Sequence, residues 1–205
     1  GAAITNATGG EGKASGGYGI RSDGELSISG GTIGSLTTDD NGKQIPDPTT
    51  GALGGNAATG EQGGHGIYSK GQLFISDGAN IINAKGGDSQ KNGGDGIRGN
   101  DRLTISGGEI QQTTGGNATG ESGTGGSGIR SNDTLIISNS ATITNATGGT
   151  STNGTGGNGI YSRRELKIDG GAAITNATGG ASTDDTGGYG IRSGSLLTIS
   201  DNATI

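Results

Sequence analysis

The chain places isolated isoleucines and leucines among polar residues, and this pattern returns at nearly constant intervals. Each return begins with a GGxGI motif; a leucine follows the closing isoleucine by six residues, and another isoleucine stands two residues further on. The closing isoleucines stand 47, 30, 32, 31 and 31 residues apart: Ile20, Ile67, Ile97, Ile129, Ile160 and Ile191. A period of this length predicts a repeat protein, in which each repeat buries its few apolar side chains against its neighbours.

Each repeat contains three short segments in which apolar and polar residues alternate with a period of two. In one repeat these are residues 159–162, 166–168 and 172–178, and such alternation is typical of β-strands. Between the segments stand DG, ND, GG and DN pairs, which favour tight turns. Helix is not expected, because no window has 3.6-residue periodicity and each interior glycine would cost a helix about 1 kcal/mol.

Short strands at equal spacing form a continuous core when equivalent strands stack one repeat above the next. We therefore predict an all-β fold, a right-handed single-stranded parallel β-helix with about 31 residues and three short strands per rung. Rungs should lie about 4.8 Å apart, with like residues stacked on like. The residue two after each anchor isoleucine, serine in five repeats and Gly99 in one, should point inward into a tight corner. Asparagines of the third strand, such as Asn145 and Asn176, should bond along the stack.

We expect residues 1–205 to form a single solenoid domain. Residues 1–15 are a partial rung, because GAAITNATGG at the start recurs unchanged at 171–180, and repeats begin at residues 16, 63, 93, 125, 156 and 187. The first repeat is longer by about half a rung, which predicts an inserted loop within 37–62 that holds both prolines. The Gly/Thr/Ser/Asn-rich segments that precede each GGxGI should lie as loops along one edge of the stack. Since the chain starts and stops in mid-repeat, we expect it to be part of a longer protein.

Composition narrows the class of protein less than the repeat does. The 50 glycines among 205 residues and the 26% of hydrophobic residues would by themselves indicate disorder, but a disordered chain has no reason to hold its isoleucines to a period. The absence of cysteine excludes disulfides and thiolate metal sites. No run of 18 apolar residues exists, so no membrane span is expected. The net charge of −6 argues against nucleic acid as a partner.

The residue that follows each anchor isoleucine should point outward, and it is arginine in four repeats and tyrosine in two. Stacked about 5 Å apart, these side chains would form a basic and aromatic stripe, with like charges repelling by about 1 kcal/mol per neighbouring pair in water. Arginine pairs with carboxylates and tyrosine faces pack on sugar rings, so a uronic-acid polymer is the expected ligand. The alternative is a solvated face relieved by acids such as Asp23, Glu25 or Asp101. The ligand-binding candidates are Arg21, Tyr68, Arg98, Arg130, Tyr161 and Arg192.

The one histidine, His65, lies in a Gly-His-Gly triplet that resembles the GHG of polygalacturonases, which also have β-helix folds. The NTD and RIK motifs of those enzymes are missing, and Asp39 and Asp40 lie in the inserted loop without a strand to position them. General acid–base catalysis needs carboxylates at set separations, so no catalytic residue and no enzyme activity are predicted. We expect an exposed loop tip at the position of His65, because its residue type varies freely between repeats: Tyr18, His65, Asp95, Ser127, Asn158 and Tyr189.

Metal binding is considered only for calcium. The segment GGDGIRGND at 93–101 resembles the calcium-binding nonapeptide GGxGxDxUx, but Arg98 stands where an aspartate is required and the period differs. The loop acids Asp88, Glu121, Asp184 and Asp185 are better explained as solvated than as a cation site. No metal site and no other cofactor are therefore predicted.

The pattern GGxGIxSxGxLxISGGTI, seen best from Gly16 to Ile33, resembles the repeats of a family of secreted bacterial β-helix proteins. Members of this family, found in clostridia and gut bacteria, are described as carbohydrate-binding domain proteins. The resemblance covers essentially the whole chain and implies a pectin-lyase-like right-handed β-helix, an extracellular or cell-surface location, and non-catalytic binding of acidic plant or mucosal polysaccharide. Calcium sites occur in that family, whereas this chain lacks an obvious acidic calcium cluster and has longer Gly/Thr loops.

Two classes of function remain open at this point. The first is extracellular carbohydrate binding, with a polysaccharide or a cell-surface glycan as the partner. The second is a structural or adhesin stalk of a bacterial surface protein that has no ligand of its own, because adhesins use similar repeats. The motif letters alone do not separate them, since most are residues of the core and corners.

Overall fold

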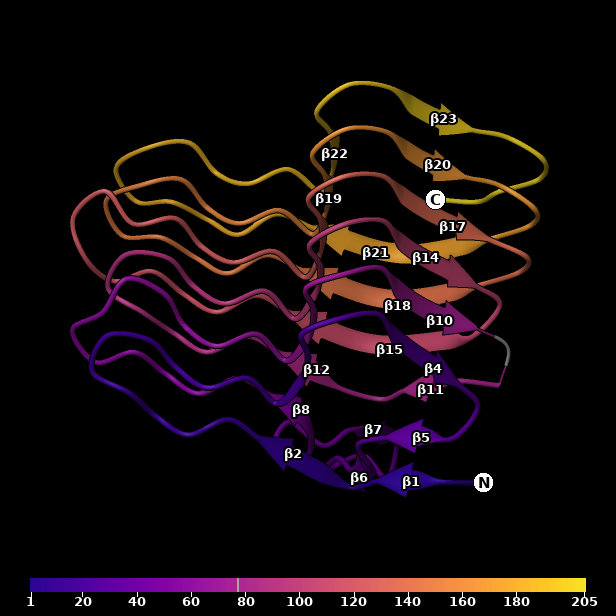
Figure 1. The fold of residues 1–205 in the computed structure, drawn as a ribbon, viewed down its shortest axis with the longest axis horizontal. Helices are drawn as coiled ribbons and strands as arrows, with labels where there is room; N and C mark the ends of the chain where they lie inside the picture. Colours follow the sequence, from indigo (N-terminus) through magenta and orange to yellow (C-terminus); the bar gives the residue numbers. More distant parts are fainter. Residues whose placement is uncertain (77) are drawn as a thin grey trace.

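The computed structural model describes residues 1–76 and 78–205, and the helix-free all-β prediction is confirmed for these residues. The chain winds through about six stacked rungs of about 31 residues each, from the N-terminus at the bottom of Figure 1 to the C-terminus at the top. Each rung contributes short strands to three parallel sheets. The stack is wider than it is tall. The longest axis of the molecule, horizontal in Figure 1, lies parallel to the rungs rather than along the direction in which they stack.

The first sheet is built from the strands that begin at the anchor isoleucines. Its strands are β3 (Ile20–Ser22), β9 (Ile67–Ser69), β13 (Ile97–Gly99), β16 (Ile129–Ser131), β19 (Ile160–Ser162) and β22 (Ile191–Ser193). Every anchor isoleucine pairs with the anchor of the next rung. The predicted stacking of like on like is therefore confirmed for this sheet.

The second sheet is built from the LxIS segments, with leucine paired to leucine and isoleucine to isoleucine. Its strands are β4 (Leu26–Ser29), β10 (Leu73–Ser76), β14 (Leu103–Ser106), β17 (Leu135–Ser138), β20 (Leu166–Ile168) and β23 (Leu197–Ile199). The turn that leaves this sheet needs left-handed backbone, supplied by glycine pairs in some rungs and by Asn139 and Ser140 at φ 53° and 58° in another.

The third sheet closes each rung. Its strands are β1 (Ala3–Ile4), β2 (Asn6–Thr8), β5 (Thr32–Ile33), β8 (Gly51–Leu53), β11 (Asn80–Ile81), β12 (Ala84–Lys85), β15 (Glu109–Thr114), β18 (Thr142–Thr147) and β21 (Ala173–Thr178). The predicted amide contact along the stack is present between Asn176 Nδ2 and Asn145 Oδ1 at 3.1 Å. In the first rung Gly51 occupies the equivalent place opposite Asn6, so the amide row is not continuous.

The core lies between the three sheets and consists of the periodic isoleucines and leucines. Fifteen of these, among the described residues, have no exposed surface, and each stabilises the fold by roughly 1.5–3 kcal/mol relative to an exposed side chain. The inward serines fill the corner as predicted: Ser69, Ser131 and Ser162 are buried. Each donates its hydroxyl to carbonyls of its own rung and of the rung before it, as Ser131 does to Thr134 and Asp101.

The inserted segment of the first rung is partly strand. An antiparallel hairpin is formed by β6 (Leu36–Thr38) and β7 (Gln44–Pro46). The chain returns to the third sheet at β8, which pairs with β2 below and β12 above. Only the part up to about residue 50 therefore leaves the stack, and residues 51–62 follow the path of an ordinary rung.

The glycine-rich segments lie on one side of the stack, as expected, but they are an ordered second lobe rather than irregular surface loops (Figure 1). Isolated parallel bridges join them rung to rung, as from Ala57 to Ser89 and on to Ala118. Two glycine pairs in each rung form the neck between the lobes. The second glycine of each pair donates its N–H to a glycine carbonyl at 2.8–2.9 Å, which makes one continuous column through the molecule: Gly10, Gly17, Gly55, Gly64, Gly87, Gly94, Gly116, Gly126, Gly149, Gly157, Gly180 and Gly188.

Candidate ligand-binding site

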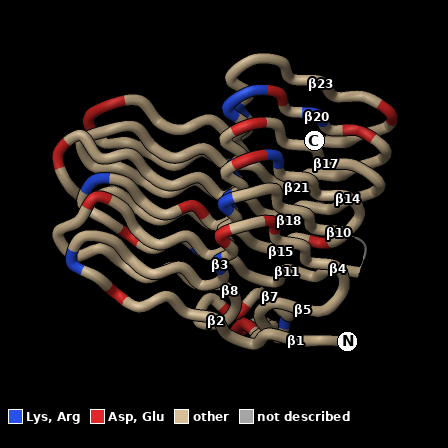
Figure 2. The backbone as a smooth tube through the Cα atoms, in the orientation of Figure 1, with Lys and Arg blue, Asp and Glu red and all other residues tan. Residues whose placement is uncertain are grey.

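The outward residues of the first sheet form the predicted stripe. Strand pairing places each one directly against its equivalent in the next rung, in the order Arg21, Tyr68, Arg98, Arg130, Tyr161 and Arg192. The two end arginines are exposed and the four central side chains are half-buried. The structure thus brings all six sequence candidates together on one face. In the molecule as a whole, charged residues lie mainly at the corners of the rungs and at the outer edge of the second lobe (Figure 2).

Arginine and tyrosine side chains of the stripe pack on each other. The Arg130 and Arg192 guanidinium carbons lie 5.4 and 5.6 Å from the centre of the Tyr161 ring, and Arg192 also lies 5.2 Å from Tyr189. Arg21 lies 5.0 Å from the ring of Tyr18. Cation–π contacts of this length hold the guanidiniums in place, and their attraction offsets part of the repulsion between neighbouring positive charges.

The counter-ions of the stripe match the expected ones only at Arg21. Asp23 pairs with Arg21 at 2.6 Å, a side-chain contact that raises the pKa of the arginine. Arg98 instead contacts Asp95 at 3.4 Å, and Asp101 takes no part in that pair. Arg130 donates Nε to the amide oxygen of Asn132 at 2.9 Å. The positive charge of the central stripe is therefore only partly compensated.

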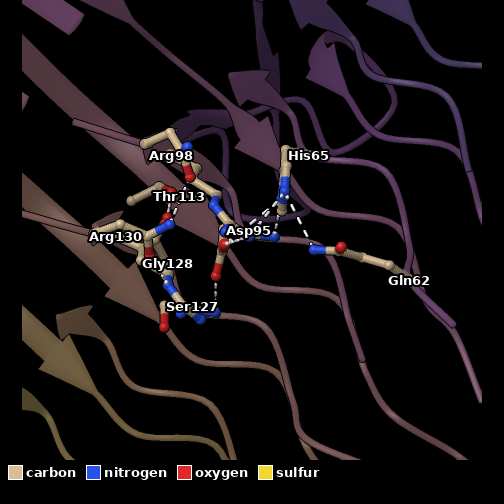
Figure 3. Close-up of polar contacts among 10 residues, drawn as sticks. Gln62, His65, Asp95, Arg98, Thr113, Ser127, Gly128 and Arg130 are labelled. Atoms are coloured by element: carbon tan, nitrogen blue, oxygen red, sulfur yellow. Dashed lines mark hydrogen bonds and ion pairs between the residues drawn. The ribbon is translucent and has the colours of Figure 1, made fainter. Parts of the chain in front are cut away.

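The prediction of an exposed loop tip at His65 is wrong. The exposed fraction is 1% for His65, 2% for Asp95 and 4% for Ser127, because the second lobe covers this row where the neck meets the first sheet. Figure 3 shows Gln62 on one side of the His65 ring and Asp95, Arg98 and Ser127 on the other. The variation in residue type at this position suggests an exposed side chain. Histidine, aspartate and asparagine nevertheless each carry a hydrogen-bond acceptor, and this was the available indication of a common buried role.

This row of side chains binds the backbone of the next rung. The Asp95 N–H donates to His65 Nδ1 at 2.7 Å, the Ser127 N–H donates to Asp95 Oδ1 at 2.7 Å, and the Tyr189 N–H donates to Asn158 Oδ1 at 3.0 Å. Because Nδ1 accepts a hydrogen bond, the neutral ring carries its proton on Nε2. Burial lowers the pKa of His65 to about 4; Asp95 opposes this shift, and Arg98 and Arg130 add to it.

A polar hollow of about 250 Å³ opens beside this row. It lies where the stripe meets the second lobe, and its charged lining residues are Asp95, Arg98 and Arg130. The side chain of Arg98 is 17% exposed, and its Nε is buried without a hydrogen-bond partner among the described residues. The hollow was not predicted, because nothing in the spacing of the apolar residues indicates that the second lobe packs against this sheet.

Neither a metal cluster nor a membrane helix is seen in the described part of the chain. No three histidine or acidic side chains of residues 1–76 and 78–205 gather as a metal site requires. Over the same residues, no helix has the length and apolar character needed to cross a bilayer.

Comparison with models of protein families, with curated proteins and with solved structures found no match to this chain. The arguments about function that follow therefore rest on the geometry of the stripe, of the hollow and of the buried row beside them.

Proposed function

We propose that this chain is a non-catalytic carbohydrate-binding module of a secreted or cell-surface bacterial protein, and that it binds acidic polysaccharide along the stripe. The observation that carries the proposal is the unbroken register of four arginines and two tyrosines over six adjacent strands. The resemblance of the repeat to secreted carbohydrate-binding β-helix proteins supports the same ligand class and location.

The chemistry of the stripe suits a polymer that carries carboxylates. Six strands about 4.8 Å apart span about 24 Å, which gives an extended chain several contact points. Guanidinium groups pair with carboxylates through parallel N–H donors. Arg130 and Arg192 pack on the Tyr161 ring, and Tyr18 and His65 stack on Tyr68. These tyrosines therefore offer a sugar their hydroxyls rather than ring faces. Because the whole chain carries −6, the stripe is a local region of opposite sign that favours one orientation of an acidic ligand.

The buried row beside the stripe supports a binding role rather than hydrolysis. His65 Nδ1 and Asp95 Oδ1 each accept a backbone N–H of the following rung, so both atoms are occupied in holding the stack together. A general acid or base must instead reach the proton it transfers. His65 and Asp95 are therefore explained as structural residues.

The second candidate function is a stalk that presents other domains, and the glycine column favours it. The column ties each rung to the next through backbone hydrogen bonds in addition to those of the three sheets. Such a stack resists bending whether or not it binds a ligand. Binding measurements separate the two candidates.

Replacement of two stripe arginines tests the proposal. We expect R98S/R130S to weaken binding of polygalacturonate at least tenfold in calorimetric titration, because two of the four guanidiniums are lost. The matched control is R163S/R164S, which also removes two positive charges, from exposed positions outside the stripe; its affinity should stay within twofold of the wild type. Melting temperatures establish that both variants are folded. Equal weakening by the two variants would reject the stripe, and a wild type that binds no acidic polymer would favour the stalk.

A further inference from the structure

The central arginine of the hollow is held in place by groups that leave part of it unsatisfied. Arg98 Nη1 donates to Asp95 Oδ2 at 3.4 Å; His65 Nε2 lies 3.2 Å away but carries the ring proton and accepts no bond from it. Its Nε, less accessible still, has no partner among the described residues. An unpaired buried donor of a charged group is costly. Because Nε has almost no accessible surface, a ligand in the hollow can offset that cost only by pairing with the terminal nitrogens of Arg98.

The second guanidinium stands one rung away. Arg130 pairs with Arg98 in the first sheet, so the two groups project from backbone positions about 4.8 Å apart. Arg130 donates its Nε–H to Asn132, which leaves the two terminal nitrogens of Arg130 for another acceptor. Both arginines line the same hollow, and Gln62, Asn92 and Thr124 supply further polar groups around it.

The charge of the hollow matches one negative group. Two guanidiniums and the Asp95 carboxylate leave a formal charge of +1, because burial keeps His65 neutral at pH 7. The same carboxylate would repel a second negative charge, which disfavours a dianionic phosphate. The planar end of a guanidinium, formed by its two terminal nitrogens, matches the two coplanar oxygens of a carboxylate.

We propose that this hollow is the subsite for a single hexuronate carboxylate, held by the terminal nitrogens of Arg98 and Arg130. The inference rests on the proposed function, because it assigns to the hollow one acidic sugar of the polymer that lies along the stripe. Gln62, Asn92 and Thr124 are placed to bind hydroxyls of the same sugar. The remaining stripe residues then contact neighbouring sugars with less selectivity for charge.

The test separates this subsite from the stripe as a whole. Trigalacturonate and its methyl ester, in which a methyl group removes the charge of each carboxylate, are titrated into the wild type and into R98K. Lysine keeps the positive charge and loses the planar end, so we expect R98K to lose at least tenfold in affinity for the acid and to bind acid and ester about equally. The control R163K, an exposed arginine outside the stripe, should behave as the wild type.

A second measurement uses the unmodified protein, in case R98K is unstable. The Arg98 Nε–Hε resonance of ¹⁵N-labelled protein, assigned by its absence from R98K or by backbone-linked spectra, should shift on addition of methyl galacturonoside and not of its methyl ester. If polygalacturonate binds while this resonance stays unmoved, the subsite is wrong and the proposed function stands. If the resonance moves but the polymer does not bind, the proposed function fails and the subsite stands. A larger shift with a sulfated neutral sugar would overturn the assignment to a carboxylate.

Discussion

At the position of His65, three of the six rungs supply a side-chain hydrogen-bond acceptor to the rung that follows. His65 Nδ1, Asp95 Oδ1 and Asn158 Oδ1 each accept the backbone N–H of the equivalent residue one rung later. A buried N–H left without a partner costs about 1–3 kcal/mol, so these side chains stabilise the junction between the first sheet and the second lobe. Three residue types therefore perform the same task here: an imidazole nitrogen, a carboxylate oxygen and an amide oxygen each accept one backbone N–H.

Substitution of His65 tests this role. We expect H65A to lower the free energy of unfolding by about 2–3 kcal/mol, because it leaves the Asp95 N–H unsatisfied and opens a space among buried groups. H65N should cost less than half as much, since Asn158 performs the same task elsewhere in the row. Urea unfolding measures both values. Equal losses in the two variants would show that packing, and not the acceptor, is what matters at this position.

The same histidine should make stability depend on pH. Burial lowers the pKa of His65 to about 4 from an ordinary value of 6.5, so the unfolded chain takes up the proton first as pH falls. Stability that is fully present above pH 6.5 is therefore lost between 6.5 and about 4, by an amount on the order of 3 kcal/mol. Unfolding in urea across this window should show the loss in the wild type. H65N keeps every acidic group and should show a much smaller loss; parallel curves would contradict the assignment to His65.

Among the elements, the glycine pairs determine the shape of each rung. In the neck, a methyl group added to Gly126 would overlap the carbonyl oxygen of Gly94, and one added to Gly94 would overlap that of Gly64. Successive rungs can approach this closely in the neck only without side chains. The column of hydrogen bonds and the second lobe both depend on this approach.

Alanine substitution in the column should be severe. We expect G126A to lower the free energy of unfolding by at least 3 kcal/mol, because the clash is with the backbone of the preceding rung and relief requires the two rungs to separate. The control is G24A, where an added methyl group meets nothing within 4 Å; it should change stability by less than about 0.5 kcal/mol. Thermal unfolding followed by circular dichroism compares them. A G126A protein as stable as G24A would mean that the neck is not closely packed.

The elements differ in how far the sequence could predict them. The strands of the first two sheets follow directly from the spacing of Ile20 and its equivalents, because large apolar side chains leave a periodic record. The second lobe has no such record: its interior consists of glycines, alanines and serines, which make contact through backbone atoms. The paired GG on both sides of each loop was the one regular indication of a neck. The hollow beside Arg98 followed from that lobe, so it could not be anticipated either.

For the whole molecule, the register of the rungs determines what the surface can do. The stripe exists only because residues about 31 positions apart in sequence become neighbours in the first sheet, and the hollow exists only because the second lobe stacks with the same period. A slip of one residue between rungs would turn an outward arginine inward and break the buried row. Polysaccharide binding, the subsite and the role of His65 all depend on this register.

Distances between spin labels along the second sheet test the register most directly. The chain has no cysteine, so labels can be attached at will to cysteines introduced at Ser27 and at one of three outward positions that pair in series with it: Ile136, Lys167 and Thr198. Pulsed electron paramagnetic resonance should give separations that increase by about 5 Å from each pair to the next. The expected backbone distances from Ser27 are about 14 Å to Ile136, about 19 Å to Lys167 and about 24 Å to Thr198. Distances that fail to increase in this order, or that are broadly scattered, would contradict the stacked, in-register rungs.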